Sequence, residues 1–190
     1  VGLNFIDVYE RTGLYPNALP SGLGREGAGV VEALGPGVRG LEVGERVAYV
    51  SSQAGSYAQR RCMAADRLVT IPDGVSDRLA AAAMLKGLTA QFLLRRTHRV
   101  RKGDVVVIHA AAGGVGLIAA QWARHLGATV IGVVGSEAKA EFARGHGCHH
   151  TLILGRDDLP AMVRELTGGK GANVVYDSIG KDTFIASLDC

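Results

Sequence analysis

The feature that most constrains this chain is an apolar run, Val105–His109, that leads directly into the glycine-rich segment AAAGGVG. A run of β-branched residues is typical of a strand buried on both faces of a sheet. Apolar residues recur at helical spacing from Val115 to Leu126, which predicts a helix directly after the turn. The segment therefore predicts a buried strand, a tight turn and a helix whose first N–H groups are free to bind an anion.

The glycines of this turn have a physical role in binding a diphosphate. Gly113 would let the backbone approach the phosphates, and Gly116 would let the helix pack closely on the strand. Ala111 stands where a G-x-G-x-x-G fingerprint has its first glycine. Strand, turn and helix in this order favour a dinucleotide site over a simple turn of small residues. We expect the diphosphate to contact Gly113, Gly114, Val115, Gly116 and Leu117.

The residues after the second expected strand, Thr129–Val134, should read the ribose. A site that prefers NAD(H) usually has Asp or Glu about 20 residues after the loop. Here the strand is followed by Gly135 and Ser136, and the acidic Glu137 comes one residue later, in the expected first helical turn. Lys139 could pair with a 2′-phosphate. The sequence therefore favours NADP(H), with Gly135, Ser136 and Lys139 as binding residues.

The remaining pattern predicts two domains, 1–85 and 86–190. Short apolar segments separated by turns predict a β-rich first part, with strands at Ala28–Ala33, Glu45–Val50, Tyr57–Arg61 and Leu68–Ile71. A helix at Leu79–Leu85 and a second helical stretch ending near Thr97 flank the expected boundary. After Asp104, strands alternate with helices, and Leu152–Leu154 and Val174–Tyr176 complete a parallel, doubly wound sheet. The fold class is α/β, and both ends of the chain are expected to be incomplete.

Composition limits the class of protein. The net charge is +3, there are three cysteines, and no apolar run approaches the ~20 residues needed to span a bilayer. Three cysteines do not make a disulfide framework, which favours the reducing cytoplasm. The basic residues between Arg95 and Lys102 have no interleaved aromatics, so a solvated helix end is favoured over a nucleic-acid patch.

Several motifs together resemble one family. They are GREGAGVV (Gly24–Val31), GERV (Gly44–Val47), LKGLTA (Leu85–Ala90), HAAAGGVGLIAAQWA (His109–Ala123) and VVYDSIG (Val174–Gly180). In this order they resemble the zinc-independent, zeta-crystallin-like quinone oxidoreductases of the medium-chain dehydrogenase/reductase superfamily. The resemblance implies a GroES-like catalytic domain followed by a Rossmann domain, NADPH as cofactor, and a homodimer.

The superfamily divides on zinc, and the sequence favours the zinc-free branch. By resemblance, zinc-dependent members have a Cys ligand where Asn4 stands and a His ligand where Arg25 stands. Arginine does not deprotonate to become a ligand, and an amide oxygen replaces a thiolate poorly. The other metal-like cluster, His146–His150, matches no standard zinc spacing. We therefore expect no metal site.

The resemblance also implies roles for individual residues. Asn4 and Tyr15 are expected as catalytic residues at the nicotinamide and substrate end, where Asn4 would donate a hydrogen bond to a developing oxyanion. By the same resemblance Thr89 would lie near the nicotinamide. Ser178 follows the last expected strand, at the carboxyl edge where ligands bind in doubly wound sheets, so it should also lie near the cofactor. Leu154 departs from the family, in which a tyrosine is expected beside the adenine ribose, and Arg156 could compensate.

These features predict an NADPH-dependent reductase that transfers hydride to a quinone without a metal. An alternative is an enoyl or 2-alkenal reductase, because the same scaffold adds hydride to activated C=C bonds. A second alternative is a non-catalytic NADPH-binding protein with a crystallin-like or RNA-binding role.

Overall fold

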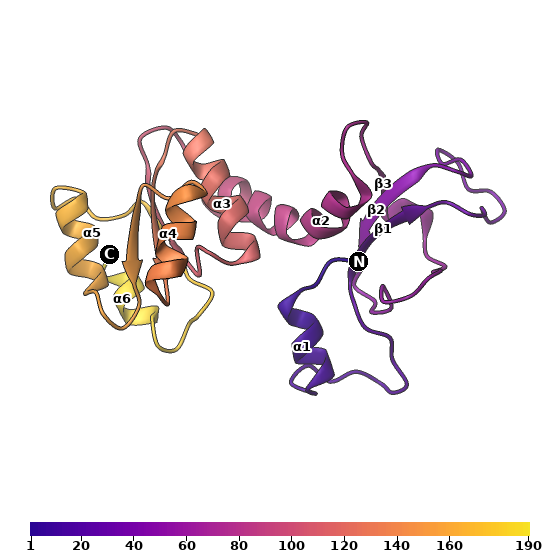
Figure 1. The fold of residues 1–190 in the computed structure, drawn as a ribbon, viewed down its shortest axis with the longest axis horizontal. Coiled ribbons are helices and arrows are strands. Elements are labelled where there is room, and N and C mark those ends of the chain that lie inside the picture. Colours follow the sequence, from indigo (N-terminus) through magenta and orange to yellow (C-terminus); the bar gives the residue numbers. More distant parts are fainter. The chain divides into compact units, whose positions relative to one another are not determined.

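The computed structural model describes residues 1–190, and the chain divides into two compact units, Val1–Leu85 and Lys86–Cys190 (Figure 1). The first unit is built on a three-stranded antiparallel sheet, and the second on a four-stranded parallel sheet. The fold class expected from the sequence, α/β with a β-rich first part and a Rossmann-type second part, is confirmed.

In the first unit, the strands are β1 (Glu26–Val30), β2 (Arg46–Val50) and β3 (Leu68–Thr70), in that order across the sheet. Ala48, Ile71 and Ala80 form its small buried core. A helix, α1 (Phe5–Arg11), precedes the sheet, and a short 3₁₀ turn, η1 (Ala65–Arg67), leads into β3.

One expectation for the first unit is wrong, and one helix was missed. Tyr57–Arg61 is a loop, not a strand, because the Arg61 guanidinium fixes it through hydrogen bonds to Ser51 Oγ, Ser56 Oγ and the Gln53 carbonyl. The helix α1 was not anticipated. It is only seven residues long and has no clear apolar stripe, because its buried residues are Asp7 and Glu10.

The break in the helix expected after Leu85 is wrong, whereas the two compact units do divide between Leu85 and Lys86. One helix, α2 (Asp77–Phe92), continues through Gly87 and passes into a π-helical turn, η2 (Leu93–Thr97). A helical glycine costs only about 1 kcal/mol relative to alanine. Ala90 and Leu94 are fully buried in the core of the second unit, and that burial outweighs the cost.

The parallel sheet of the second unit has the strand order β6-β5-β4-β7. Its strands are β4 (Val105–His109), β5 (Thr129–Val134), β6 (His150–Ile153) and β7 (Val174–Tyr176). The helices between and after them are α3 (Gly114–His125), α4 (Glu137–Gly145), α5 (Leu159–Leu166) and α6 (Phe184–Leu188). β4, β5 and β7 have the bounds expected from the sequence, and β6 begins two residues earlier than expected. The doubly wound pattern is confirmed.

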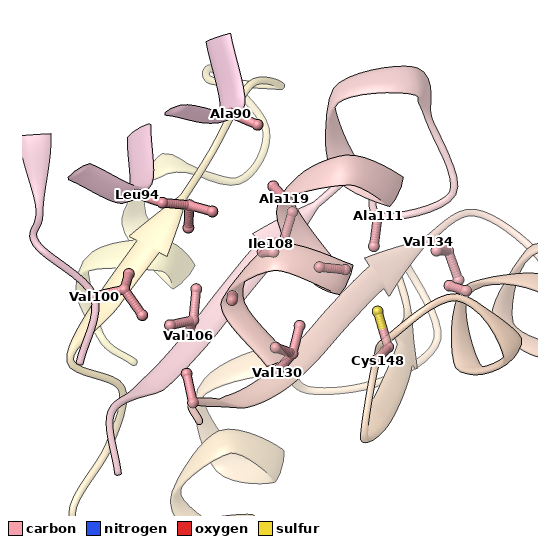
Figure 2. Packing of buried hydrophobic residues seen from close by; sticks show 14 of the residues in the cluster. Ala90, Leu94, Val100, Val106, Ile108, Ala111, Ala119, Val130, Val134 and Cys148 are labelled. Atoms are coloured by element: carbon pink, nitrogen blue, oxygen red, sulfur yellow. The ribbon is translucent and has the colours of Figure 1, made fainter. Parts of the chain in front are cut away.

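Alternating strand residues supply two cores, one on each face of this sheet. Val106 and Ile108 face α3, α4 and the end of α2, whereas Val107 faces α5. Figure 2 shows Ile108 beside Ala119 in the first of these cores. The residues of α3 that lie closest to the sheet have small side chains. They are the buried residues of this helix, Gly116, Ala119, Ala120 and Ala123. The larger residues expected to form the buried stripe, Val115, Ile118, Trp122 and Leu126, flank this face and are half-buried.

Candidate functional site

The turn after β4 presents free backbone donors at the start of α3. Gly113 is the N-cap residue, and its own N–H donates to the Ala110 carbonyl over 2.8 Å. The Leu117 N–H is the first to bond back, to the Gly113 carbonyl over 2.9 Å. The N–H groups of Gly114, Val115 and Gly116 therefore point out of the helix end, where the helix dipole favours an anion. This geometry fits the diphosphate of a dinucleotide.

Tight packing under the turn explains the small residues there. A Cβ atom on Gly116 would lie 2.5 Å from the Ala110 carbonyl oxygen and 2.7 Å from the Ala111 Cα. Ala111 is fully buried, and a Cβ on Gly132 of β5 would lie 2.8 Å from the Ala111 Cβ. Figure 2 shows Ala111 pointing into the core between the sheet and α3. The alanine at the first fingerprint position therefore fills a space that a glycine would leave empty.

Lys86 is a residue that sequence reasoning missed. A Cβ on Gly114 would lie 2.7 Å from Lys86 Cδ, so the Lys86 side chain covers the start of α3. A lysine beside unpaired N–H groups adds positive charge to the expected phosphate position. The motif LKGLTA contained this residue, but only the fold shows that α2 brings it to the turn. Thr89, on the same helix, is half-buried one turn later.

The expected ribose end lies where β5 leads into α4. Gly135 directly follows β5, and a Cβ atom there would meet no other atom within 4 Å. The Ser136 side chain caps α4 by accepting the Lys139 N–H over 3.4 Å. The Lys139 side chain is exposed. β4 and β5 are adjacent parallel strands, so the phosphate turn and the residues 135–139 lie at the same edge of the sheet.

Neighbouring β6 brings Arg156 to this edge. The Arg156 guanidinium forms ion pairs with Glu137 in the first turn of α4 and with Asp157. Leu154, near which the resemblance led us to expect a tyrosine, is exposed, and its side chain cannot form a hydrogen bond. The hydrogen-bonding group at the end of β6 is therefore the guanidinium of Arg156.

The carboxyl end of β7 carries a hydrogen-bond network that sequence reasoning missed. Asp177 accepts the hydroxyl groups of Thr183 and Ser187, each over 2.7 Å, and Ser187 Oγ lies 3.1 Å from Nε2 of the buried His109. Burial opposes the ionisation of Asp177, but these bonds and two backbone N–H groups outweigh it and hold its pKa well below the usual range. Ser178, predicted to contact the cofactor, follows directly and is exposed.

This network predicts acid sensitivity. Burial lowers the pKa of His109 despite the nearby Asp177 charge, so folding keeps the imidazole neutral. Below about pH 6.5 the unfolded chain binds a proton that the folded chain excludes, so stability is lost as pH falls. We expect the free energy of urea unfolding to fall between pH 7.5 and about pH 5, and His109→Gln to reduce that fall. The exposed His125→Gln is the matched control, and an equal effect of both variants would contradict the assignment.

In the first unit, the two residues expected to take part in catalysis flank α1. Asn4 is the N-cap residue, and its N–H donates to the Asp7 carboxylate over 3.1 Å, while Tyr57 OH donates to the same carboxylate over 3.0 Å. Tyr15 follows the helix, and its N–H donates to the Tyr9 carbonyl over 3.1 Å. The rings of Tyr9 and Tyr15 lie 5.2 Å apart. One short helix therefore fixes both residues.

Arg25 has a structural partner that the sequence did not reveal. Its guanidinium donates to the carboxylate of Glu10 on α1 and to the Ser52 carbonyl. The Glu10 side chain is only 1% exposed. The residue at the expected position of a zinc-binding histidine is therefore a cation already committed to a buried carboxylate. This chemistry does not fit a zinc ligand set at Asn4 and Arg25.

The histidine-rich segment at the end of α4, His146–His150, makes structural contacts. His149 Nδ1 accepts the Val130 N–H over 3.0 Å, and His146 lies against the Phe142 ring. Burial raises the pKa of the Cys148 thiol to about 11, so it is a poor nucleophile and metal ligand near neutral pH. The three cysteines are unpaired. None of the helices is both long and apolar enough to span a membrane.

Comparison with known proteins matches each unit to a family. Residues 1–73 match the alcohol dehydrogenase GroES-like domain, and residues 114–190 match the zinc-binding dehydrogenase family. The second name refers to zinc, but the positions discussed above hold Asn4 and Arg25.

Individual relatives are similar over the whole chain. A quinone oxidoreductase of Pseudomonas aeruginosa is 53% identical over 100% of this chain and 59% of its own length. A 2-haloacrylate reductase of Burkholderia sp. is also 53% identical, with the same coverage. The structure of Escherichia coli quinone oxidoreductase complexed with NADPH superposes with a TM-score of 0.96 at 48% identity, over 100% of this chain and 59% of that one. The chain thus spans about 59% of the length of these relatives.

The matches cover both units in the expected order, and they include relatives about half identical in sequence. They confirm the resemblance noted in the motifs. The chain belongs to the quinone oxidoreductase family of the medium-chain dehydrogenase/reductase superfamily.

Proposed function

We propose that the protein is an NADPH-dependent reductase that transfers hydride to a quinone without a metal. The observation that carries the proposal is the turn after β4. It presents three free N–H groups at the start of α3, and Gly116 packs closely against Ala110 beneath them. This turn fits a diphosphate and leaves no room for larger side chains. Bound NADPH would supply the hydride from its nicotinamide.

The second unit, residues 86–190, would bind the cofactor through Gly113–Leu117, Gly135, Ser136, Lys139 and, near the nicotinamide, Thr89 and Ser178. The first unit, residues 1–85, would supply Asn4 and Tyr15. The Asn4 side-chain amide would donate a hydrogen bond to the oxygen that gains charge during transfer. A reduced quinone ring spreads that charge, so orientation can replace a Lewis acid.

Quinones and enones compete as the substrate class. One relative at 53% identity is a 2-haloacrylate reductase, so reduction of an activated C=C bond is the second candidate. Initial rates of NADPH oxidation with 1,4-benzoquinone, 9,10-phenanthrenequinone, 2-chloroacrylate and 2-hexenal separate the two. We expect the quinones to give the higher kcat/KM. A higher value with the haloacrylate or the enal would replace the quinone assignment.

Lys139 tests the cofactor assignment. We expect Lys139→Ala to weaken NADPH binding by about tenfold, because an ion pair to the 2′-phosphate is lost. NADH binding should change little. Isothermal titration of both nucleotides measures this, with the exposed Lys181→Ala as control. Unchanged NADPH affinity would remove Lys139 from the 2′-phosphate site.

The non-catalytic alternative predicts tight NADPH binding with no oxidation by any acceptor. The basic residues between Arg95 and Lys102 lie in η2 and the following turn. They give little support to the RNA-binding role that this alternative includes. Unpaired cysteines suit a reducing cytoplasm. The family resemblance also implies a homodimer, which analytical ultracentrifugation of the intact protein would test.

A further inference from the structure

The loop after β6 is fixed beside the end of β5. The two strands pair in parallel with Val134 opposite Ile153, and the Leu154 N–H donates to the Val134 carbonyl over 2.8 Å. Gly155 then reverses the chain with a φ of +82°. The next residue, Arg156, is thereby placed next to the first turn of α4, which follows β5.

Arg156 is held there by two carboxylates. Its Nε and Nη2 atoms donate to Asp157 over 2.8 and 3.2 Å, and its Nη1 atom donates to Glu137. Asp157 is itself fixed, because it accepts the Ile153 N–H over 2.7 Å. A bidentate contact to an anchored carboxylate orients the guanidinium. The remaining contact is the ion pair with Glu137.

Glu137 is the acidic residue that would otherwise define the ribose site. In a Rossmann domain, a carboxylate near the end of the second parallel strand, here β5, accepts the 2′-hydroxyl of NADH and repels the 2′-phosphate of NADPH. Pairing with Arg156 offsets this charge and occupies one of the two carboxylate oxygens of Glu137. Lys139, two residues further along α4, then adds a positive charge.

We propose that Arg156 is a specificity-determining residue for NADPH over NADH, acting by pairing with Glu137 and by placing a guanidinium next to the 2′-phosphate. The proposal rests on the NADPH dependence proposed above and assigns its selectivity to a pair of residues on adjacent loops. Removal of Arg156 would leave Glu137 as a free carboxylate at the ribose.

Isothermal titration of the intact protein with NADPH, NADH, adenosine 2′,5′-bisphosphate and 5′-AMP tests this. We expect Arg156→Ala to weaken NADPH and the 2′,5′-bisphosphate by about tenfold or more. NADH and 5′-AMP, which lack the 2′-phosphate, should bind as before or more tightly. Adding Glu137→Gln to Arg156→Ala should recover much of the lost NADPH affinity, because the repelling charge is gone.

Arg144→Ala is the matched control. It removes the same charge from the far end of α4, where Arg144 donates to Thr151. The ratio of NADPH to NADH affinity should not change. Equal weakening of both nucleotides by Arg156→Ala, no weakening, or a wild-type protein that binds NADH as tightly as NADPH would overturn the proposal. Selective NADPH binding without turnover on any acceptor would overturn the proposed function and leave this inference intact.

Discussion

Gly116→Val is expected to reduce NADPH affinity by about a hundredfold, because displacement of the turn disrupts two or more charge-assisted hydrogen bonds to the diphosphate. The added side chain would begin 2.5 Å from the Ala110 carbonyl oxygen and 2.7 Å from the Ala111 Cα. Both neighbours are backbone atoms, so the turn must move to accommodate it. We also expect the free energy of unfolding to fall by about 1–3 kcal/mol, the usual cost of overpacking.

Gly145→Ala provides the matched control. Gly145 ends α4, and a Cβ there meets no atom within 4 Å. We expect its unfolding free energy to stay within about 1 kcal/mol of the wild type, with unchanged NADPH affinity. Urea unfolding and calorimetric titration measure the two quantities. If Gly116→Val bound NADPH like the control, the diphosphate would lie elsewhere.

Arg25→Met is expected to destabilise the protein by about 3 kcal/mol, because it leaves the buried carboxylate of Glu10 without its partner. Adding Glu10→Met should restore part of that loss, since the unpaired charge is removed. The exposed pair Arg60–Glu32 supplies the control, and Arg60→Met should cost less than about 1 kcal/mol.

Urea unfolding of these variants separates two explanations of Arg25. If Arg25→Met lost as little unfolding free energy as Arg60→Met, Arg25 would merely replace a zinc-binding histidine and would have no structural function. A large loss, relieved by Glu10→Met, would show that the position has a structural function of its own. Because α1 also carries Asn4, we expect the KM for the acceptor to rise in Arg25→Met even where the protein remains folded.

The sequence predicted the second unit well because its signals are local. Val105–His109, the glycine turn and the cap at Ser136 each depend on nearby residues, and the structure places them as expected. Gly87 misled the prediction, because burial of Ala90 and Leu94 outweighs the local helix preference of one glycine.

The missed contacts depend on partners far apart in the sequence. Arg25 and Glu10 are fifteen residues apart, and Ser187 lies 78 residues from His109. Neither pair has a spacing signature. Sequence reasoning noticed Arg156 and Glu137 separately, but their pairing across nineteen positions follows only from the parallel register of β5 and β6.

We have proposed that this protein transfers hydride from NADPH to a quinone without a metal. The most direct measurement is the initial rate of NADPH oxidation by 1,4-benzoquinone in the intact protein, before and after exhaustive dialysis against a chelator. We predict steady oxidation in step with hydroquinone formation, at a rate that chelation does not change. Loss of the rate on chelation and its recovery on adding zinc, or no oxidation despite tight NADPH binding, would show that this proposed function is wrong.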